Sequence, residues 1–530
     1  MLWLPLIGLS LAMADPAEAS SFSWSLTNGS GVSANLARKG KAKTLTFRSC
    51  PAGLTAGNFI YISRGFGVAE SVDITALACA PGKPGNVTIV TRHSHLGKWT
   101  AATSTAGIQE AIAVLGSQKR EVQVGPGTFE VHSRITVPSN ITLRGAGIDT
   151  TTVLVPRNEF NNSAPWQFGL NPSGTVIFGP PGNSDITVAG LTVKFASQSS
   201  APNDSYGVLF VDVHNSLIDS VAVRDGPILR KGNTFLPIAV LGLSSNDTVQ
   251  NSKVYNRPCP ISSEGSGGFM AGGKSNRFVH NYVSNGCNSA YVTGGSDTLF
   301  EGNVFELASS TMVPQAQAFA ADNSSSARFV NNRCVGNGTA PACFAAVTDA
   351  RKPDTTESTF IGNEARDCGQ GLQFQSTVGR ARGIRVEKGS VVNCVEPLSL
   401  MGIIDDFSIA GVEGVRDLHS ARIVSIPVNS KFLHDVPTVG SDVIWMTGAA
   451  GDYAVGGFKE GSIRRQVEIV NAAGHAMTLS GNDLKSRGEN RICAGPAGET
   501  VSPPESRVNL AYSTGRGCWA VSGAVVPLAW

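Results

Sequence analysis

The chain has 530 residues and combines 60 glycines and 27 prolines with only 15% charged residues, a composition typical of a turn-rich, all-β protein. Its formal charge of +2 is near neutral and no run of Lys and Arg is dense, so we expect no nucleic-acid partner. A chain of this length can bury one large core and one or two small ones.

An apolar stretch from Leu2 to Ala14 lies at the N-terminus. Thirteen residues are too few to span a bilayer. Small residues at Ala-x-Ala spacing are typical of signal cleavage near Ala14 or Ala19, although no Lys or Arg precedes the apolar stretch. We therefore expect residues 1–20 to be a signal peptide. The mature protein is then secreted to the extracellular space or the periplasm, with no membrane insertion after signal removal.

Ten cysteines follow this segment. An even number of cysteines in an exported chain favours disulfides, and local pairs would close loops of modest length. No CxxC motif and no His/Cys cluster with zinc spacing occurs in the sequence, which disfavours a zinc site. The candidate local pairs are Cys50 with Cys79, Cys259 with Cys287, and Cys493 with Cys518.

Residues 21–100 predict a small N-terminal β-module. A helix is predicted next, because apolar residues from Ile108 to Leu115 recur at helical spacing and Gly116 ends the pattern. We expect this helix to cap the open end of a solenoid, whose first coil would otherwise expose strand edges and core. The strand candidates of the N-terminal module are Leu45–Phe47, Phe59–Ser63, Ser71–Thr75 and Asn86–Thr91.

A short motif of apolar residues around an Asn or Ser occurs seven times between residues 216 and 395, at spacings of 22 to 31 residues. This period indicates a stacked solenoid. Strand alternation with Gly-rich turns disfavours leucine-rich, ankyrin and helical repeats, which leaves a parallel β-helix with coils about 4.8 Å apart. The anchors are expected to stabilise bends rather than to catalyse. They are Ser220, Asn251, Asn281, Asn303, Asn332, Asn363 and Asn393.

Two motifs lie between the helix and the repeats, in the segment from Glu121 to Val155: V-x-V-G-P-G-T-F and I-T-V-P-S-N-I-T-L-R-G-A-G. With the preceding helix, they resemble the opening of the pectate-lyase-like right-handed β-helix superfamily. The resemblance implies a right-handed parallel β-helix, which we place at residues 101–435. It does not select a function, because the superfamily includes lyases, hydrolases, epimerases, phage tailspikes and proteins without known activity.

The repeat pattern is lost in residues 436–530, where short alternating strands and Gly turns predict a C-terminal β-domain. This segment resembles the small β-domain that follows some tailspike-like and bacterial β-helices. Roles in capping the last coil, binding carbohydrate or forming oligomers all remain open. Trp519 is expected in the core, because a lone Trp in an alternating strand is usually packed.

The strands that precede the bends can be aligned from coil to coil, and most of their outward positions are small or apolar. The polar exceptions are the candidate site residues. Asp322 and Asp349 lie near the ends of aligned strands on neighbouring coils, so their carboxylates could approach within about 5 to 8 Å. The candidate catalytic residues are Asp322, Asp349 and Lys274; the candidate substrate-binding residues are Gln375 and, in the turns after the strands, Arg351, Arg380 and Arg382.

Three chemistries fit the two aspartates. As a hydrolytic pair, one carboxyl would protonate the glycosidic oxygen while the other activates water or attacks the sugar. As Ca²⁺ ligands, they would help to neutralise a uronate while a base such as Lys274 removes the C5 proton. As structural residues, they would cap turns.

Signatures of the known enzymes are missing from the sequence. It contains neither the Asp-Asp and Gly-His-Gly signatures expected of polygalacturonase-like hydrolases nor a close copy of the acidic calcium cluster and Arg of pectate lyases. The leading hypothesis is a secreted carbohydrate-active protein, a polysaccharide lyase or glycoside hydrolase acting on an extracellular polysaccharide, with Ca²⁺ as an open cofactor. The alternative is a non-catalytic tailspike-like or surface glycan-binding protein, with a homotrimer as an open assembly.

Overall fold

A computed structural model describes the chain in two compact units. Unit 1 comprises Met1–Ile238 and Asp247–Lys253, and unit 2 comprises Ala239–Asn246 and Val254–Trp530. Among the described residues, regular structure is almost entirely β, with one α-helix. The described residues are 17–116, 120–156, 174–196, 200–201, 205–229, 234–256, 267–285, 290–307, 316–348, 354–376, 380–438, 441–459, 466–493 and 499–528.

A seven-stranded sheet forms the first part of unit 1, in the order β2-β8-β5-β6-β7-β4-β3. Its strands alternate between a buried face and an exposed face, and Phe47, Ile60 and Trp99 lie in the core that they enclose. The strands are β2 (Ser25–Thr27), β3 (Val32–Ser33), β4 (Ala42–Phe47), β5 (Phe59–Phe66), β6 (Glu70–Ala78), β7 (Gly85–Val90) and β8 (Leu96–Thr103).

The predicted helix is present as α1 (Ile108–Leu115), and it contacts strands of the first coil. It buries Ile108, Ala111 and Ile112, the positions at helical spacing. Gly107 begins the helix with a φ of 89°, a conformation that glycine adopts without strain. The helix also contacts η1 (Ala19–Phe22) and β1 (Ala17–Glu18), which pairs with β9. The expected cap is therefore confirmed.

Parallel coils make up the remainder of unit 1. Strand β12 pairs in parallel with β9 and β15, and β18 pairs in parallel with β15 and β21. A second parallel series runs through β11, β14 and β17. The strands are β9 (Arg120–Val124), β10 (Gly127–Glu130), β11 (Ile135–Thr136), β12 (Ile141–Gly145), β13 (Thr151–Val155), β14 (Gly174–Gly179), β15 (Thr187–Phe195), β16 (Ser200–Ala201), β17 (Ser205–Val211), β18 (Leu217–Arg224), β19 (Ile228–Leu229) and β21 (Thr248–Gln250); β20 (Phe235–Leu241) and β22 (Lys253–Tyr255) continue into unit 2.

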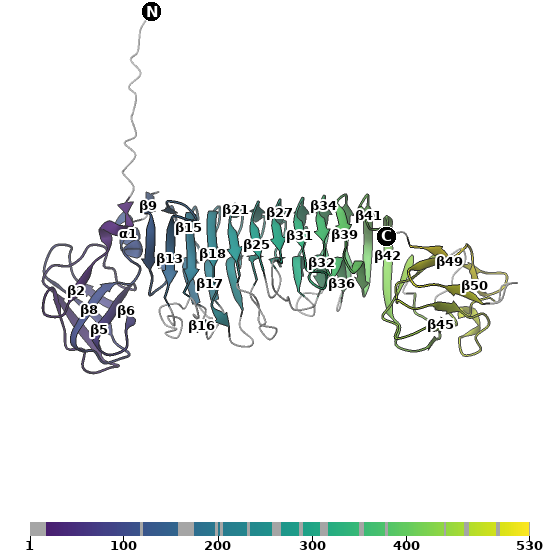
Figure 1. Cartoon of the computed structure of the whole chain (residues 1–530), viewed down its shortest axis with the longest axis horizontal. Coiled ribbons are helices and arrows are strands. Elements are labelled where there is room, and N and C mark those ends of the chain that lie inside the picture. The colour runs from purple at the N-terminus through teal and green to yellow at the C-terminus, as the bar shows by residue number, and fades with distance from the viewer. Residues whose placement is uncertain are drawn as a thin grey trace, which may run out of the picture. The chain divides into compact units, whose positions relative to one another are not determined.

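In unit 2, one series of parallel strands carries the candidate site (Figure 1), and we name it the β23–β40 sheet. Phe269, Tyr291, Phe319, Phe344 and Leu372 lie in register on five successive strands. This is the alignment predicted from the sequence, which is thereby confirmed. The strands are β23 (Phe269–Ala271), β26 (Tyr291–Thr293), β29 (Gln317–Asp322), β32 (Ala342–Thr348), β36 (Gln370–Ser376) and β40 (Glu396–Met401).

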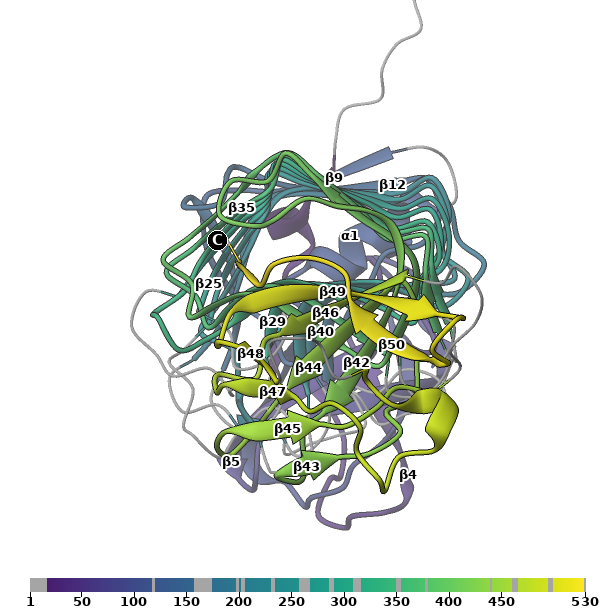
Figure 2. The same ribbon diagram turned by 90° about the vertical axis from the view of Figure 1, so that its right-hand side faces the viewer.

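Two further parallel series complete the coils of unit 2. Viewed along the stack, β29 and β40 lie on one side of the coils, and β35 lies on another (Figure 2). The first series is β24 (Arg277–Val279), β27 (Leu299–Glu301), β30 (Arg328–Val330), β34 (Thr359–Ile361) and β38 (Arg385–Glu387); the second is β25 (Tyr282–Ser284), β28 (Val304–Glu306), β31 (Arg333–Val335), β35 (Glu364–Arg366) and β39 (Ser390–Val392). A shorter pair is β33 (Asp354–Thr356) and β37 (Arg380–Arg382).

Stacked aromatic rings fill the core between these series. The Tyr291 and Phe319 rings are parallel, with centroids 4.6 Å apart. A second stack places the Phe329 and Phe360 centroids 4.8 Å apart. Such pairs contribute about 0.5–1.5 kcal/mol each beyond the burial of their area. Because the stacking distance matches the coil spacing, one aromatic residue per coil is sufficient to continue each ladder.

Four of the predicted anchors form a buried asparagine ladder. The Asn332 Oδ1 atom accepts a hydrogen bond from the Asn303 backbone amide at 2.9 Å, and the Asn363 Oδ1 atom accepts one from the Asn332 amide at 2.9 Å. The Asn281 amide donates in the same way to Asn303. The bend role predicted for these residues is confirmed.

The other three anchors lie outside this ladder, so their predicted place in it is wrong. Ser220 and Asn251 come one position before it, whereas Asn393 lies at the next bend and donates a hydrogen bond to Asp367. Each has a positive φ, between 51° and 54°. The ladder position beside Asn251 is held by Ser252, whose hydroxyl accepts a hydrogen bond from the Val221 amide. Asn tolerates the left-handed conformation better than most residues, so the sequence pattern does not separate the two positions.

The C-terminal part of unit 2 follows β41 (Ile403–Ala410), which pairs with β42 in an antiparallel manner. Trp519 is fully buried there and donates a hydrogen bond from Nε1 to the Phe458 carbonyl at 2.8 Å, which confirms its predicted core position. The elements are β42 (Leu418–Pro427), β43 (Phe432–Leu433), β44 (Val443–Thr447), β45 (Tyr453–Val455), β46 (Gln466–Asn471), β47 (Met477–Leu479), η4 (Gly488–Asn490), β48 (Thr500–Ser502), β49 (Ser506–Ser513), β50 (Cys518–Val521) and β51 (Val526–Pro527).

Four disulfides join described cysteines. The predicted pairs Cys50–Cys79 and Cys493–Cys518 are confirmed. Cys259 and Cys287 lie outside the described residues. The pairs Cys334–Cys343 and Cys368–Cys394 were not predicted. Both lie beside the site described next.

Candidate functional site

Asp322 is one of two predicted catalytic residues within the described part of the chain; the other is Lys274. Asp322 is half-buried at the end of β29, where the Asn323 side-chain amide donates a hydrogen bond to its Oδ1 atom at 2.7 Å. Register places Val347 beside it on the next strand. On the preceding strand, the neighbour is Gly294. Within the described residues, the adjacent register positions therefore supply no second carboxylate.

Lys274 lies apart from Asp322. It is exposed and forms an ion pair with Asp297 at 3.8 Å. Lys274 is bridged to Ser296, and Ser296 to Ser325 in the turn after β29. Lys274 is therefore two coil steps, about 10 Å, from the coil that carries Asp322. The structure does not bring these two residues together for a shared proton transfer.

Of the predicted binding residues, Gln375 lies in the same register row as Asp322, separated from it by Val347. Arg380 and Arg382 were predicted in a turn, and this prediction is wrong because they form β37. Ala381 between them is fully buried, so the segment alternates as a strand. Strand β37 pairs with β33 and β41, outside the β23–β40 sheet. Asp349 and Arg351 lie outside the described residues.

A calcium site was expected to include Asp322 and Asp349 as ligands. Across the part of the chain that the structure describes, no three His, Cys, Asp or Glu side chains cluster so as to hold a metal ion. Ca²⁺ takes six to eight oxygen ligands, and Asp322 with Gly294 and Val347 at its sides does not match such a set. We derive no chemical step through calcium.

A cavity of about 350 Å³ lies where β32, β36 and β40 begin. Its polar lining includes Thr339, Gln370 and Glu396, and we name it the bend cavity. The Gln370 side-chain amide donates a hydrogen bond to the Glu396 carboxylate at 2.6 Å. The remaining lining residues are Gly338, Pro341, Ala342, Gly369 and Val395.

A second pair of amides continues the polar surface beside the cavity. Gln317 Nε2 donates a hydrogen bond to Gln373 Oε1 at 3.2 Å. Gln317 is in register with Ala342, and Gln373 with Ala345, so the two glutamines lie on the strands that flank β32. The small alanines on β32 leave room for this contact.

The two unpredicted disulfides hold the loops of the bend cavity. Cys334–Cys343 closes the loop that carries Thr339, and Cys368–Cys394 joins the bends that carry Gly369 and Val395. Within the first loop, the Asn337 side chain accepts hydrogen bonds from the amides of residues 339 and 340, at 3.1 and 3.0 Å. The loops are thus fixed before any ligand arrives.

Four polar residues in and beside the bend cavity were not predicted from the sequence: Gln317, Gln370, Gln373 and Glu396. One available signal was the spacing of the cysteines, since Cys334, Cys343, Cys368 and Cys394 precede or follow bends of successive coils. A second was the alternation of glutamines in Gln370–Ser376, of which only Gln375 was selected.

One family model agrees with the architecture. Residues 181–396 match a family model described as a right handed beta helix region. Similar solved structures include a surface adhesin of Streptococcus pneumoniae, with 12% identity over 60% of this chain and 94% of the other, at a TM-score of 0.37. The A-module of a mannuronan C-5 epimerase from Azotobacter vinelandii shares 14% identity over 70% of this chain and 88% of its own, at a TM-score of 0.38.

A polygalacturonase from Erwinia carotovora shares 11% identity over 60% of this chain and 93% of its own, at a TM-score of 0.39. No curated protein matches the chain. No site residue is assigned from these similarities.

Proposed function

We propose that this chain, a right-handed parallel β-helix protein, is a secreted protein that binds an extracellular polysaccharide in the bend cavity and along the adjoining face of the β23–β40 sheet. The observation that carries the proposal is the pair of disulfides that fix the loops around a polar cavity. A site whose loops are already ordered loses less conformational entropy when a ligand binds.

The chemistry of the bend cavity suits sugar hydroxyls. Gln370 offers both a donor and an acceptor, Glu396 offers acceptor oxygens, and Thr339 offers a hydroxyl. A volume of about 350 Å³ lies within the usual range of ligand sites, about 300–1,000 Å³. Val395, which is largely exposed, adds an apolar contact for the face of a sugar ring.

The β-helix also supplies a repeating surface for a chain-like ligand. Gln373 is in register with Ser399, and Gln375 with Met401, on successive coils. Successive coils are about 4.8 Å apart. A polysaccharide that runs along the stack therefore meets the equivalent position of the next coil at each step, and some of these positions are polar, such as Asp322 and Gln375.

A binding panel tests the proposal. Neutral and acidic bacterial and plant polysaccharides would be immobilised, and binding of the wild type compared with a Gln370→Ala/Glu396→Gln variant. Loss of the Gln370 amide and of the Glu396 charge, which strengthens hydrogen bonds from sugar hydroxyls, is expected to reduce affinity by tenfold or more. Glu387→Gln, an exposed change on β38, is the matched control and should bind as the wild type does. Equal binding by the wild type and the double variant would refute the location.

A second candidate function, cleavage of the bound polysaccharide at Asp322, is favoured by one observation. A Cβ atom built at Gly294 would meet only the Asp322 backbone oxygen, at 3.4 Å, so no side chain from this register position screens Asp322. Asp349 stays the candidate second carboxylate. Unsaturated-product absorbance with new reducing ends would indicate a lyase, whereas reducing ends alone would indicate a glycoside hydrolase. Asp322→Asn should abolish the signal while binding persists; assays with and without Ca²⁺ test the cofactor.

Export and assembly complete the proposal. The disulfides fit an oxidising compartment. In the described part of the chain, no helix is long and apolar enough to cross a membrane. A tailspike-like form of this protein would be a homotrimer, for which light scattering should give three times the mass of the mature chain. The mass of a monomer would contradict the homotrimer, but it would not contradict glycan binding.

A further inference from the structure

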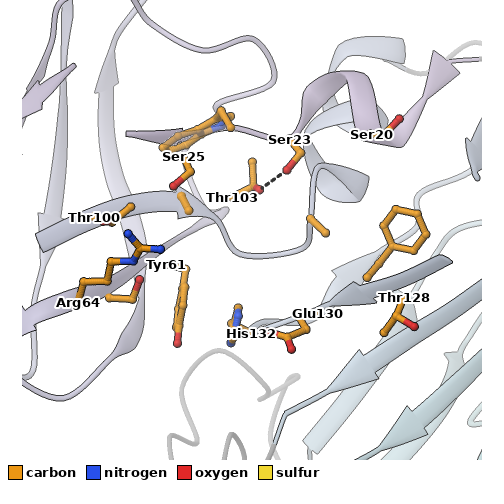
Figure 3. A pocket seen from close by; sticks show the side chains of 15 residues that line it. Ser20, Ser23, Ser25, Tyr61, Arg64, Thr100, Thr103, Thr128, Glu130 and His132 are labelled. Carbon is orange, nitrogen blue, oxygen red and sulfur yellow. Dashed lines mark hydrogen bonds between the residues drawn. The ribbon is translucent and has the colours of Figure 1, made fainter. Parts of the chain in front are cut away.

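A second cavity, of about 430 Å³, lies within unit 1 between the seven-stranded sheet and the first coil (Figure 3). Its walls come from η1 with the residues that follow it, from β5 and β8, and from β10 with its following turn. We name it the junction cavity. It shares no residue with the bend cavity.

One wall of the junction cavity is a stacked pair of rings. The Tyr61 and His132 rings are parallel within 2°, and their centroids are 3.6 Å apart. The His132 backbone is held on both sides, since its amide donates to the Ser104 carbonyl at 2.6 Å and its carbonyl accepts from the Ser71 hydroxyl at 2.7 Å. The wall is therefore rigid, and flat aromatic rings of this kind suit the face of a sugar.

Two buried polar atoms on residues that line the cavity have no hydrogen-bond partner among the described residues. They are the Trp24 indole Nε1 and the Thr100 Oγ1. A buried polar group that stays unsatisfied destabilises a protein by about 1–3 kcal/mol, so such groups call for an explanation. Both atoms are almost inaccessible to solvent, so they lie behind the cavity wall and we assign them no contact with a ligand.

Arg64 supplies a positive charge at the cavity from an unusual backbone position. Its φ is 59°, and the pairing of β5 with β8 shifts register between Arg64 and Phe66. A Cβ atom built at the next residue, Gly65, would lie 2.5 Å from the Leu96 carbonyl oxygen, so glycine is needed there. Bulges of this type redirect side chains, and strained residues gather at functional sites.

The charged groups of the cavity are available to a ligand. Neither the Arg64 side chain nor the Glu130 side chain forms a hydrogen bond or an ion pair with another described residue. In the view of Figure 3, Arg64, Tyr61, His132 and Glu130 lie across the cavity from Ser23 and Thr103, whose hydroxyls are 3.4 Å apart. The cavity thus combines a guanidinium, a carboxylate, hydroxyls and an aromatic wall.

We propose that the junction cavity binds a sugar residue that carries a carboxylate, such as a uronic acid. The Arg64 guanidinium matches a carboxylate in a two-pronged geometry. The sugar ring lies against the wall formed by Tyr61 and His132, and its hydroxyls are bonded by Ser23 and Glu130. This site is independent of the proposed function, which rests on unit 2.

The test is a titration of the full-length protein with glucuronic acid, galacturonic acid and glucose, followed by ligand-observed NMR. A uronic acid should bind and glucose should bind at least about tenfold more weakly, because only the former pairs with Arg64. Arg64→Gln should reduce uronic-acid affinity by about tenfold and remove the preference over glucose. Tyr61→Leu should weaken both sugars.

Three controls separate the outcomes. Arg38→Gln removes an exposed charge from the same module and should change nothing. Gln370→Ala/Glu396→Gln should keep uronic-acid binding, so failure here and failure of the proposed function are distinguishable. Ser23→Ala removes only a hydroxyl at the cavity and should weaken binding even if Tyr61→Leu fails to fold. Absence of uronic-acid binding, or equal binding by the wild type, Arg64→Gln and Ser23→Ala, would overturn the proposal.

Discussion

Gln370 donates a hydrogen bond to Glu396 over 2.6 Å, from one coil of the β-helix to the next. Register places the two residues directly opposite each other at the start of β36 and β40. In a parallel β-helix, equivalent positions of successive coils become neighbours, so polar residues 26 positions apart in sequence form one surface. The bend cavity is built in this way.

The disulfide between Cys368 and Cys394 should support both stability and binding. Replacing both cysteines by serine is expected to destabilise the protein by about 2–4 kcal/mol, because the closed loop constrains the unfolded chain. It should also weaken polysaccharide binding severalfold, since the bends that carry Gly369 and Val395 are no longer joined. Denaturant unfolding and a binding titration measure the two effects. Replacing Cys493 and Cys518 is the control, which should lower stability and leave affinity unchanged.

Removing the side chain of an asparagine at the centre of the ladder should destabilise the protein. In Asn332→Ala, the amide of Asn303 and the carbonyl of Phe300 lose their buried partner. We expect a destabilisation of about 2–4 kcal/mol. Asn393→Gly, at an exposed position with a φ of 54°, should change stability by less than about 1 kcal/mol. If Asn332→Ala and Asn393→Gly lower the unfolding temperature equally, the buried ladder position is no more important for stability than the exposed bend.

Burial of Glu110 should make stability depend on pH. Burial raises the pKa of this carboxyl to about 7, with a partial offset from hydrogen bonds to its own backbone and to Thr105. The folded state then holds a proton that the unfolded state releases near pH 4.5, so stability falls as pH rises from about 4.5 to 7 and is constant above. Glu110→Gln should remove this fall and be more stable than the wild type at pH 8. A wild-type profile that rises or stays flat across this window, matched by the variant, would contradict the account.

The mature N-terminus should follow Ala14. Ala17 and Glu18 pair with β9, and Ala19 is fully buried. Cleavage after Ala19 would remove this strand, whereas cleavage after Ala14 keeps it. Mass spectrometry of the exported protein should therefore find Asp15 as the first residue. A mature chain that starts at Ser20 with unchanged stability would show that β1 is dispensable.

Much of the fold follows from the sequence, because ladder residues recur at nearly fixed spacing. Phe319 and Phe344 could be aligned, since each precedes a bend at the same distance. The position of Asn251 could not be separated from that of Ser252, since both residue types suit bends. The contact between Gln370 and Glu396 was not predictable, because it depends on the register of β36 with β40. The strand at Arg380–Arg382 was missed because two charged residues resemble a solvated turn until Ala381 is known to be buried.

The most direct test of the central claim is a calorimetric titration of the full chain with an oligosaccharide from the polysaccharide that binds best in the panel. We predict saturable binding to the wild type and to Glu387→Gln, reduced tenfold or more in Gln370→Ala/Glu396→Gln. Binding of the double variant with wild-type affinity, or no binding to any glycan of the panel, would contradict a polysaccharide site in the bend cavity.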